Sequence, residues 1–435
     1  MAHGAGTPER QARVDRLLER LPPRVPLDMK VLGKRFKRDH EEWQVEYASE
    51  RFDPALDARA GRIPAYVLVP RGDDFKAPFP AMVCWHQCSI DCDLGSDSVV
   101  GKVVDRPDQA YGLELVRQGF VVIAPDTWGC GRRHIPGVRA EGECLVCHHP
   151  GRDYTEKAVL DALCTVDVLE SLDVVDPARI GAIGHSMGSH TTILHMAHDR
   201  RVRAGIVSGN DGNTHGRFES YGDALALIAP RLFMQLQGEL DGPVEAIERV
   251  KAAHRATEPA YARSNAEDDL VLRLLPCGHY FHDDFKREAY TRLKLHFGLA
   301  RPRARASLGK LLEEARQNTW SWDRVESHFP AIQGDLGATV VADRDALLAA
   351  FTDLFVNLYE KRPLKSALNV EIHDDRDEVL VVCRVAHGDD RAPVGKNDLR
   401  PSLQTLFEHA GSLSTHDEGG IRYELRLRKP DRDEP

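Results

Sequence analysis

The chain has 435 residues, of which 42% are hydrophobic and 29% are charged, a balance typical of a globular protein with a sizeable core. Its formal net charge is −10 and it has no basic, aromatic-interleaved run, so nucleic acid is not an expected partner. It has no run of about 18 apolar residues, so we expect no membrane span. Nine cysteines without an apolar N-terminal signal indicate free thiols and a cytoplasmic protein.

Short apolar runs alternate with amphipathic segments over the first 300 residues, after an amphipathic helical pattern at 14–21. This alternation predicts βαβ units and a mostly parallel sheet with helices on both faces, an α/β fold. The expected strands are 43–52, 62–70, 80–86, 120–126, 179–186, 203–209, 230–241 and 270–281. The expected helices are 110–119, 155–172, 187–198, 242–256 and 283–298.

The composition changes at RPRARASLGK (301–310), which predicts a junction between domains. We therefore expect a helical N-terminal extension over 1–42, an α/β domain over 43–300 and a smaller α+β domain over 305–435. Functional groups in parallel sheets collect at the carboxyl ends of the strands, where polar residues of this chain also fall.

Residues 184–188 read GHSMG, which fits the G-x-S-x-G nucleophile elbow. An apolar run precedes the motif and a helical pattern follows it, so Ser186 is expected on a sharp strand-to-helix turn. Glycine at both flanking positions allows a close backbone approach. A helix-capping serine is the alternative interpretation. The context favours a nucleophile.

A nucleophilic serine needs a base, and the base needs an orienting acid. Asp241, in QGELD after an apolar run, is the expected acid, and Asp211 in SGND is the rival. His279, in PCGHYF after the last apolar run, is the expected base, and His282 could compete with it.

Backbone N–H groups are expected to form the oxyanion hole. Met187 follows the nucleophile and begins a helix, so its N–H is one expected donor. The second donor is expected after the run 80–86, from the N–H of Gln87 or of Cys88. The side chain of His86 more simply has a structural role.

These residues together resemble a known family. WHQCSID (85–91), LVRQGFVVIAPDTWGCGRR (115–133) and VVDPARIGAIGHSMGSH (174–190) resemble the dienelactone hydrolase and acetyl xylan esterase-like branch of the α/β hydrolases. ALIAPRLFMQLQGELD (226–241) and PCGHYF (276–281) are similar to its acid and histidine segments. The resemblance implies an α/β-hydrolase fold with Ser186 as nucleophile, His279 as base and Asp241 as acid. It implies no metal or organic cofactor.

Six of the nine cysteines lie between positions 84 and 147, and residues 144–149 read CLVCHH. The string contains the C-x-x-C-H haem-attachment pattern, but haem is not expected in a chain without an export signal. A zinc site on Cys144, Cys147 and His148 or His149 has suitable ligand types but lacks a second C-x-x-C pair. Free thiols in a substrate-facing loop are the favoured interpretation.

The C-terminal region has its own pattern: a strand end and then a helix (340–362), a hairpin (368–388), and a helix followed by a second hairpin (399–430). FTDLFVNLYEKR (351–362) and LFEHAGSLSTHDEGGIRYELRLRKP (406–430) resemble the ATP-binding domain of histidine kinases. Lys361 stands where a second asparagine beside Asn357 is expected, and no D-x-G-x-G occurs. The resemblance therefore implies a degenerate domain used for packing, dimerisation or partner binding.

The sequence thus predicts a serine hydrolase that cleaves a carboxylic ester of a small molecule. Hydrolysis of another acyl bond, in a lactone, thioester or amide, is the alternative among enzymes. A regulatory protein that binds a ligand without turnover is the alternative from another class. The expected partners are the small ester and, as a candidate assembly, a second copy of the chain.

Overall fold

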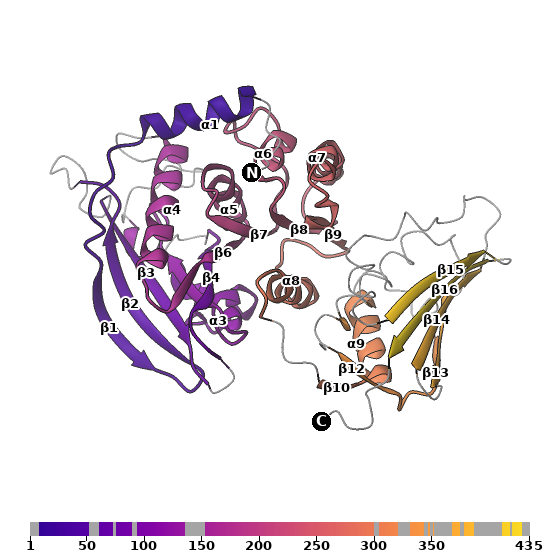
Figure 1. Cartoon of the computed structure of the whole chain (residues 1–435). Helices are drawn as coiled ribbons and strands as arrows, with labels where there is room; N and C mark the ends of the chain where they lie inside the picture. The colour runs from indigo at the N-terminus through magenta and orange to yellow at the C-terminus, as the bar shows by residue number, and fades with distance from the viewer. Residues whose placement is uncertain are drawn as a thin grey trace. The chain divides into compact units, whose positions relative to one another are not determined.

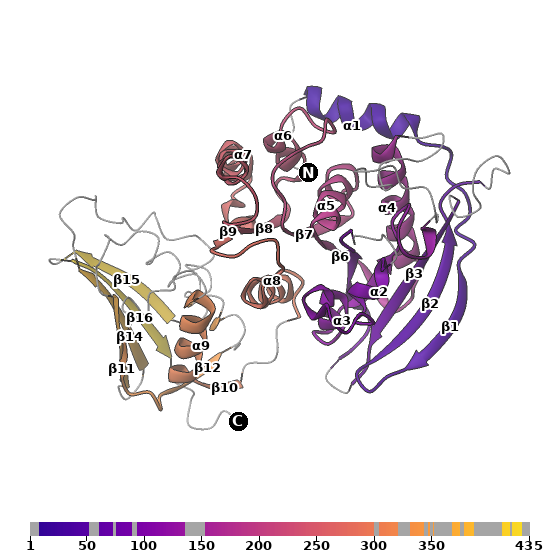
Figure 2. The same cartoon turned by 180° about the vertical axis from the view of Figure 1, so that it is seen from behind.

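The computed structural model describes residues 8–51, 61–72, 75–88, 94–134, 153–299, 304–320, 331–342, 347–348, 351, 368–374, 378–386, 411–417 and 420–428. The chain divides into two units, Met1–Lys286 and Arg287–Pro435. Each unit has its own sheet in the described residues (Figures 1 and 2).

A nine-stranded sheet runs through the first unit in the order β1-β2-β3-β5-β4-β6-β7-β8-β9. Its strands are β1 Lys30–Phe36, β2 His40–Ala48, β3 Arg62–Pro70, β4 Phe79–Trp85, β5 Val121–Pro125, β6 Val175–His185, β7 Val202–Ser208, β8 Leu232–Gly238 and β9 Leu270–Leu275. The strands from β5 to β9 in this order pair in parallel, and β1, β2 and β3 pair antiparallel. The predicted mostly parallel α/β sheet is confirmed.

Helices cover both faces of this sheet. α4 and α5 lie on one face and α3 lies on the other (Figures 1 and 2). α1 runs across α4, α5 and α6. The helices are α1 Pro8–Arg20, α2 Ser96–Val99, α3 Tyr111–Val116, α4 Tyr154–Glu170, α5 Met187–His198, α6 Tyr221–Ile228, α7 Val244–Ala262 and α8 Asp283–His296, with 3₁₀ turns at Pro107–Gln109, Gly131–Arg133 and Glu267–Asp269. α8 crosses the boundary between the units.

The central strands are buried on both faces, which explains their continuous apolar sequences. Every residue of β4 and of β5 is buried, and Val83 and Ile123 have no exposed surface. The strand β1 was not predicted from the sequence, because its residues lie exposed at the sheet edge and show no apolar alternation. No described helix is both long enough and apolar enough to cross a membrane.

The second unit has a five-stranded sheet in the order β11-β13-β14-β16-β15 and a two-stranded pair, β10 with β12. Its elements are β10 Ala304–Ser307, α9 Leu308–Trp320, β11 Ala331–Gly334, β12 Thr339–Ala342, β13 Leu368–Asp374, β14 Glu378–Ala386, β15 Gly411–Asp417 and β16 Gly420–Arg428. Both predicted hairpins are present, since β13 pairs with β14 and β15 with β16, each antiparallel. Asn357 and Lys361 lie outside the described residues.

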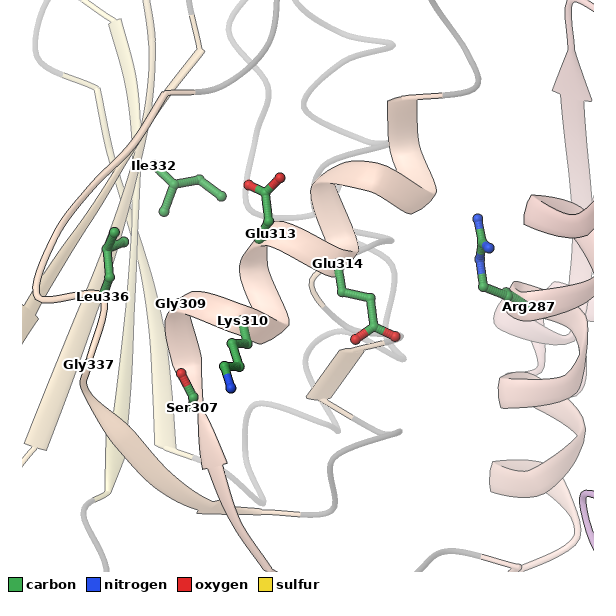
Figure 3. Close-up of a pocket in the computed structure, with 9 residues that line it drawn as sticks. All are labelled: Arg287, Ser307, Gly309, Lys310, Glu313, Glu314, Ile332, Leu336 and Gly337. Atoms are coloured by element: carbon green, nitrogen blue, oxygen red, sulfur yellow. The ribbon is translucent and has the colours of Figure 1, made fainter.

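The second unit contains an open pocket of about 880 Å³. Lys310, Glu313 and Glu314 project from α9 toward it, and Ile332 and Leu336 line the side near the sheet (Figure 3). Cations and carboxylates are mixed in its lining, so the pocket has no single charge preference. None of the expected catalytic residues lines it.

Candidate active site

Ser186 lies on a strained turn between β6 and α5. Its φ of 55° and ψ of −119° are rarely adopted by a residue with a side chain. The turn is held in place because the Ser186 N–H donates to the Ser208 carbonyl at 2.9 Å, and the Ser186 carbonyl accepts from the Ser189 N–H at 2.9 Å. The local geometry is that of the elbow expected from the sequence.

The two glycines of the motif are required by backbone contacts. A Cβ atom on Gly184 would lie 2.2 Å from the Gly188 carbonyl oxygen, and one on Gly188 would lie 2.0 Å from the Trp85 carbonyl oxygen. The first turn of α5 therefore presses directly against the end of β4. This contact brings the backbone around Met187 close to the segment in which Gln87 follows β4.

His86 fixes the loop after β4 and has no solvent exposure. Its Nε2 accepts from the Thr127 N–H at 3.0 Å, so its proton resides on Nδ1, which donates to the Gln87 carbonyl at 2.8 Å. Burial lowers the pKa of His86 below its ordinary value. Its neutral side chain orients the peptide between Gln87, which is partly buried, and Cys88, which is exposed.

His279 and Asp241 come together at the ends of β9 and β8. His279 Nδ1 lies 2.9 Å from each carboxylate oxygen of Asp241. This hydrogen bond raises the pKa of His279, against the opposing effect of burial. Burial acts to raise the pKa of Asp241, but the hydrogen bond and charge of His279 outweigh it, so the pKa of Asp241 lies below its ordinary value. The Nε2 atom of His279 is left available for a proton.

His279 lies beside the end of the strand that carries the elbow. The ring of His279 is 4.7 Å from the ring of His185, the residue that precedes Ser186. Both residues are described, and no hydrogen bond joins the Ser186 hydroxyl to His279 in this structure. Such catalytic hydrogen bonds commonly tighten only once a substrate is bound.

The rival residues have other contacts. The Asp211 carboxylate accepts from the Asn213 N–H at 2.9 Å and lies 3.7 Å from Arg249. The ring of His282 packs edge-on against Tyr280, with ring centroids 6.0 Å apart. The contact between His279 and Asp241 therefore favours Asp241 over Asp211 as the partner of the base.

A buried hydrogen-bond chain, not predicted from the sequence, connects Asp241 to the elbow. Gln237 Nε2 donates to Asp241 Oδ2 at 3.1 Å, and Gln237 Oε1 accepts from the Asn210 N–H at 2.9 Å. Asn210 Nδ2 donates to Ser189 Oγ at 3.0 Å, and that hydroxyl donates to the Ser186 carbonyl at 2.5 Å. Two glutamines in the apolar strand LFMQLQG were the available signal, because a buried amide requires hydrogen-bond partners.

The cysteine-rich loop is described only in part. Cys144, Cys147, His148 and His149 lie outside the described residues. Elsewhere in the described chain, no group of three or more His, Cys, Asp or Glu side chains could hold a metal ion. Cys130 is buried and packs with Met187 and Tyr154, so part of this cysteine-rich segment forms a wall beside the elbow.

The segment that carries the elbow is similar to a known protein family. Residues 106–215 match the sequence profile of the Dienelactone hydrolase family. The matched segment includes β5, β6, the elbow and β7. The expected resemblance is thereby confirmed for the part of the chain that carries Ser186.

The chain also has similarities to individual proteins. The chain is 27% identical over 313 residues to "Putative hydrolase YtaP" of Bacillus subtilis (strain 168), covering 66% of this chain and 98% of that protein. Two solved structures are each 15% identical to it. A glucuronoyl esterase from Solibacter usitatus has a TM-score of 0.48, with 67% of this chain and 93% of that chain covered. Acetyl Xylan Esterase 1 from Thermoanaerobacterium sp. JW/SL YS485 has a TM-score of 0.40, with 68% and 95% covered.

Proposed function

We propose that the chain is a serine hydrolase that cleaves a carboxylic ester of a small molecule through an acyl-enzyme on Ser186. The contact of 2.9 Å between His279 Nδ1 and the Asp241 carboxylate, beside the strained Ser186 elbow, is the observation that carries this proposal. It supplies a base that is held in one tautomer and a serine at a strand-to-helix turn. The match of the elbow segment to the Dienelactone hydrolase family profile supports the same assignment.

Acylation begins when His279 Nε2 takes the proton of the Ser186 hydroxyl and the serine oxygen bonds to the ester carbonyl carbon. Asp241 stabilises the imidazolium that forms and does not itself become protonated. The carbonyl oxygen becomes an oxyanion that accepts hydrogen bonds from backbone N–H groups of Met187 and of Gln87 or Cys88. The bond to the leaving oxygen then breaks, and the imidazolium returns its proton to release the alcohol.

Deacylation repeats these steps with water as the nucleophile. His279 takes a proton from water as its oxygen bonds to the acyl carbon. Collapse of the second tetrahedral intermediate breaks the bond to Ser186, which recovers its proton, and the carboxylic acid leaves. The chain, the substrate and one water account for every proton, so the proposed steps use no metal or organic cofactor.

We also propose the three-part organisation of 1–42, 43–300 and 305–435, with the last part as an accessory domain. The separate sheet of the second unit supports the C-terminal part. The segment 1–42 is not purely helical, because β1 within it pairs with β2 in the main sheet. Limited proteolysis tests the boundary: cleavage that yields a stable fragment ending near 300 supports this organisation, and cleavage confined to either end of the chain contradicts it.

A fluorophosphonate tests the activity. The serine oxygen displaces fluoride from phosphorus and forms a covalent adduct only if the serine is activated. Intact mass should reveal one adduct on the parent protein, none on Ser186→Ala, and a much slower reaction for His279→Ala. No adduct on the folded parent would contradict the serine hydrolase proposal. A panel of small aryl esters, lactones, thioesters and amides then shows which kind of acyl bond the protein cleaves.

A further inference from the structure

His185 has no part in the mechanism above, although it precedes the nucleophile. It is the last residue of β6, and only 2% of its surface is exposed. The G-x-S-x-G motif sets no requirement at this position. A buried titratable side chain beside the reacting serine therefore needs a separate explanation.

The ring of His185 contacts two other rings. The ring of His279 lies 4.7 Å away, measured between centroids, with an angle of 39° between the ring planes. The ring of Phe281 is stacked on that of His185 at 5.9 Å and 15°. Both distances lie in the range in which aromatic rings attract one another. His279, whose side chain is half exposed, is therefore packed against His185 on one face.

Two neighbours hold the ring of His185 in place. Its Nδ1 lies within hydrogen-bond distance of the Ser208 hydroxyl, at 3.1 Å. A Cβ atom on Gly209 would lie 2.8 Å from Cε1 of His185 and 3.0 Å from Cε1 of His279. Gly209 has a φ of 63°, and its missing side chain leaves room for both rings. The packing of the two rings is therefore built into the backbone that follows β7.

We propose that His185 is a positioning residue for the catalytic base. Its ring packs against the imidazole of His279 and limits the directions in which Nε2 can point, so that Nε2 is directed toward Ser186. Asp241 holds Nδ1 of His279 through a hydrogen bond. A hydrogen bond at this one atom still allows the imidazole to rotate about it. The ring of His185 removes this freedom. This inference rests on the proposed function.

The charge state of His185 suits this role. Burial lowers its pKa to about 3, and the nearby charges of His279 and Lys286 act in the same direction against that of Asp241. The Ser208 hydroxyl also faces it, at 3.1 Å from Nδ1. Because the ring of His185 is neutral, it does not repel the imidazolium that forms on His279 during the reaction. The proton taken from Ser186 therefore stays on His279.

Three variants test the proposal. His185→Leu removes the ring and keeps the site apolar, His185→Phe keeps a ring without nitrogens, and Ser208→Ala removes only the hydrogen-bond partner. We expect His185→Leu to slow fluorophosphonate acylation and kcat for an aryl ester by about 10- to 100-fold with KM nearly unchanged, since misplacing a catalytic group has effects of this size. His185→Phe and Ser208→Ala should lose less than about fivefold.

A second measurement reports the position of His279 directly. In protein made with carbon-13-labelled histidine, the Cε1–H resonance of His279 should shift in His185→Leu and stay near its parent value in His185→Phe. A folded His185→Leu variant that acylates at the parent rate would overturn the proposal, as would equal losses in the leucine and phenylalanine variants. If His185→Leu does not fold, a near-parent rate in His185→Phe supports the proposal and a large loss overturns it.

The two proposals fail in different ways. An unreactive parent protein would contradict the proposed hydrolase, whereas a reactive parent with a tolerant position 185 would contradict only the positioning role. The resonance of His279 requires no turnover. A resonance that is the same in the parent and in His185→Leu would overturn the ring contact whether or not the chain is an enzyme.

Discussion

His279 Nδ1 lies 2.9 Å from both carboxylate oxygens of Asp241, although the two residues are 38 positions apart in the chain. The contact exists because β8 and β9 pair in parallel, so the loops that follow them emerge at the same edge of the sheet. It holds the imidazole in one tautomer and leaves Nε2 directed away from the carboxylate. Four predictions follow from this site and its surroundings.

Asp241→Asn should reduce kcat/KM for an aryl ester by about 10³- to 10⁴-fold, because the amide cannot hold the required tautomer or stabilise the imidazolium. Steady-state kinetics and the rate of fluorophosphonate acylation measure this loss. Asp211→Asn is the matched control and should stay within about twofold of the parent. A greater loss of kcat/KM in Asp211→Asn than in Asp241→Asn would assign the role of acid to Asp211.

Activity should fall as the pH decreases through the pKa of His279. Asp241 raises that pKa above its ordinary value, so the unprotonated base predominates only at a pH above the raised pKa. Removing the carboxylate should move the acidic limb of kcat/KM to lower pH. A pH–rate profile of the parent beside Asp241→Asn checks the direction, and a limb that stays in place would contradict the assignment of the base.

Gln237→Leu should lower kcat by about tenfold with little change in KM, because Asp241 loses a hydrogen bond that holds its carboxylate. Its stability should also fall, by about 1–3 kcal/mol, since the Asn210 N–H is left unpaired in the interior. Gln235→Leu is the matched control on the same strand: it removes a buried amide that bonds to the Asn210 carbonyl and does not contact Asp241. Urea unfolding and steady-state kinetics separate the two effects. Equal losses of kcat in both variants would contradict a specific role for Gln237.

Folding stability should fall as the pH decreases below about 6.5, the ordinary pKa of histidine. Burial lowers the pKa of His254 to about 3, so the unfolded chain binds a proton between these values and the folded chain does not. The stabilisation is complete above 6.5 and is lost progressively as the pH approaches 3. His254→Gln should reduce the slope of the unfolding free energy against pH by up to about 1.4 kcal/mol per unit. Urea unfolding at several pH values measures this slope, and an unchanged slope would contradict the burial of a neutral His254.

Much of the fold was predictable from the sequence because its signals are local. The strands β3 to β9 are short apolar runs, and the turn at Ser186 is specified by two glycines and a helical pattern. β1 was missed since an exposed edge strand has no apolar alternation, and α6 and α9 were missed as well. Helix and strand periodicity reports burial, so it is weakest where an element is exposed or short.

The sequence by itself determined the residue types and the order of the candidate triad, serine before aspartate before histidine, together with the elbow that strains the serine. Only the tertiary structure reveals that Asp241, and not Asp211, contacts His279, because both aspartates follow strands in the sequence. The same holds for Gln237 and for the ring contact between His185 and His279. These contacts join residues from different strands, and the pairing of strands in space is not written in any local pattern of the chain.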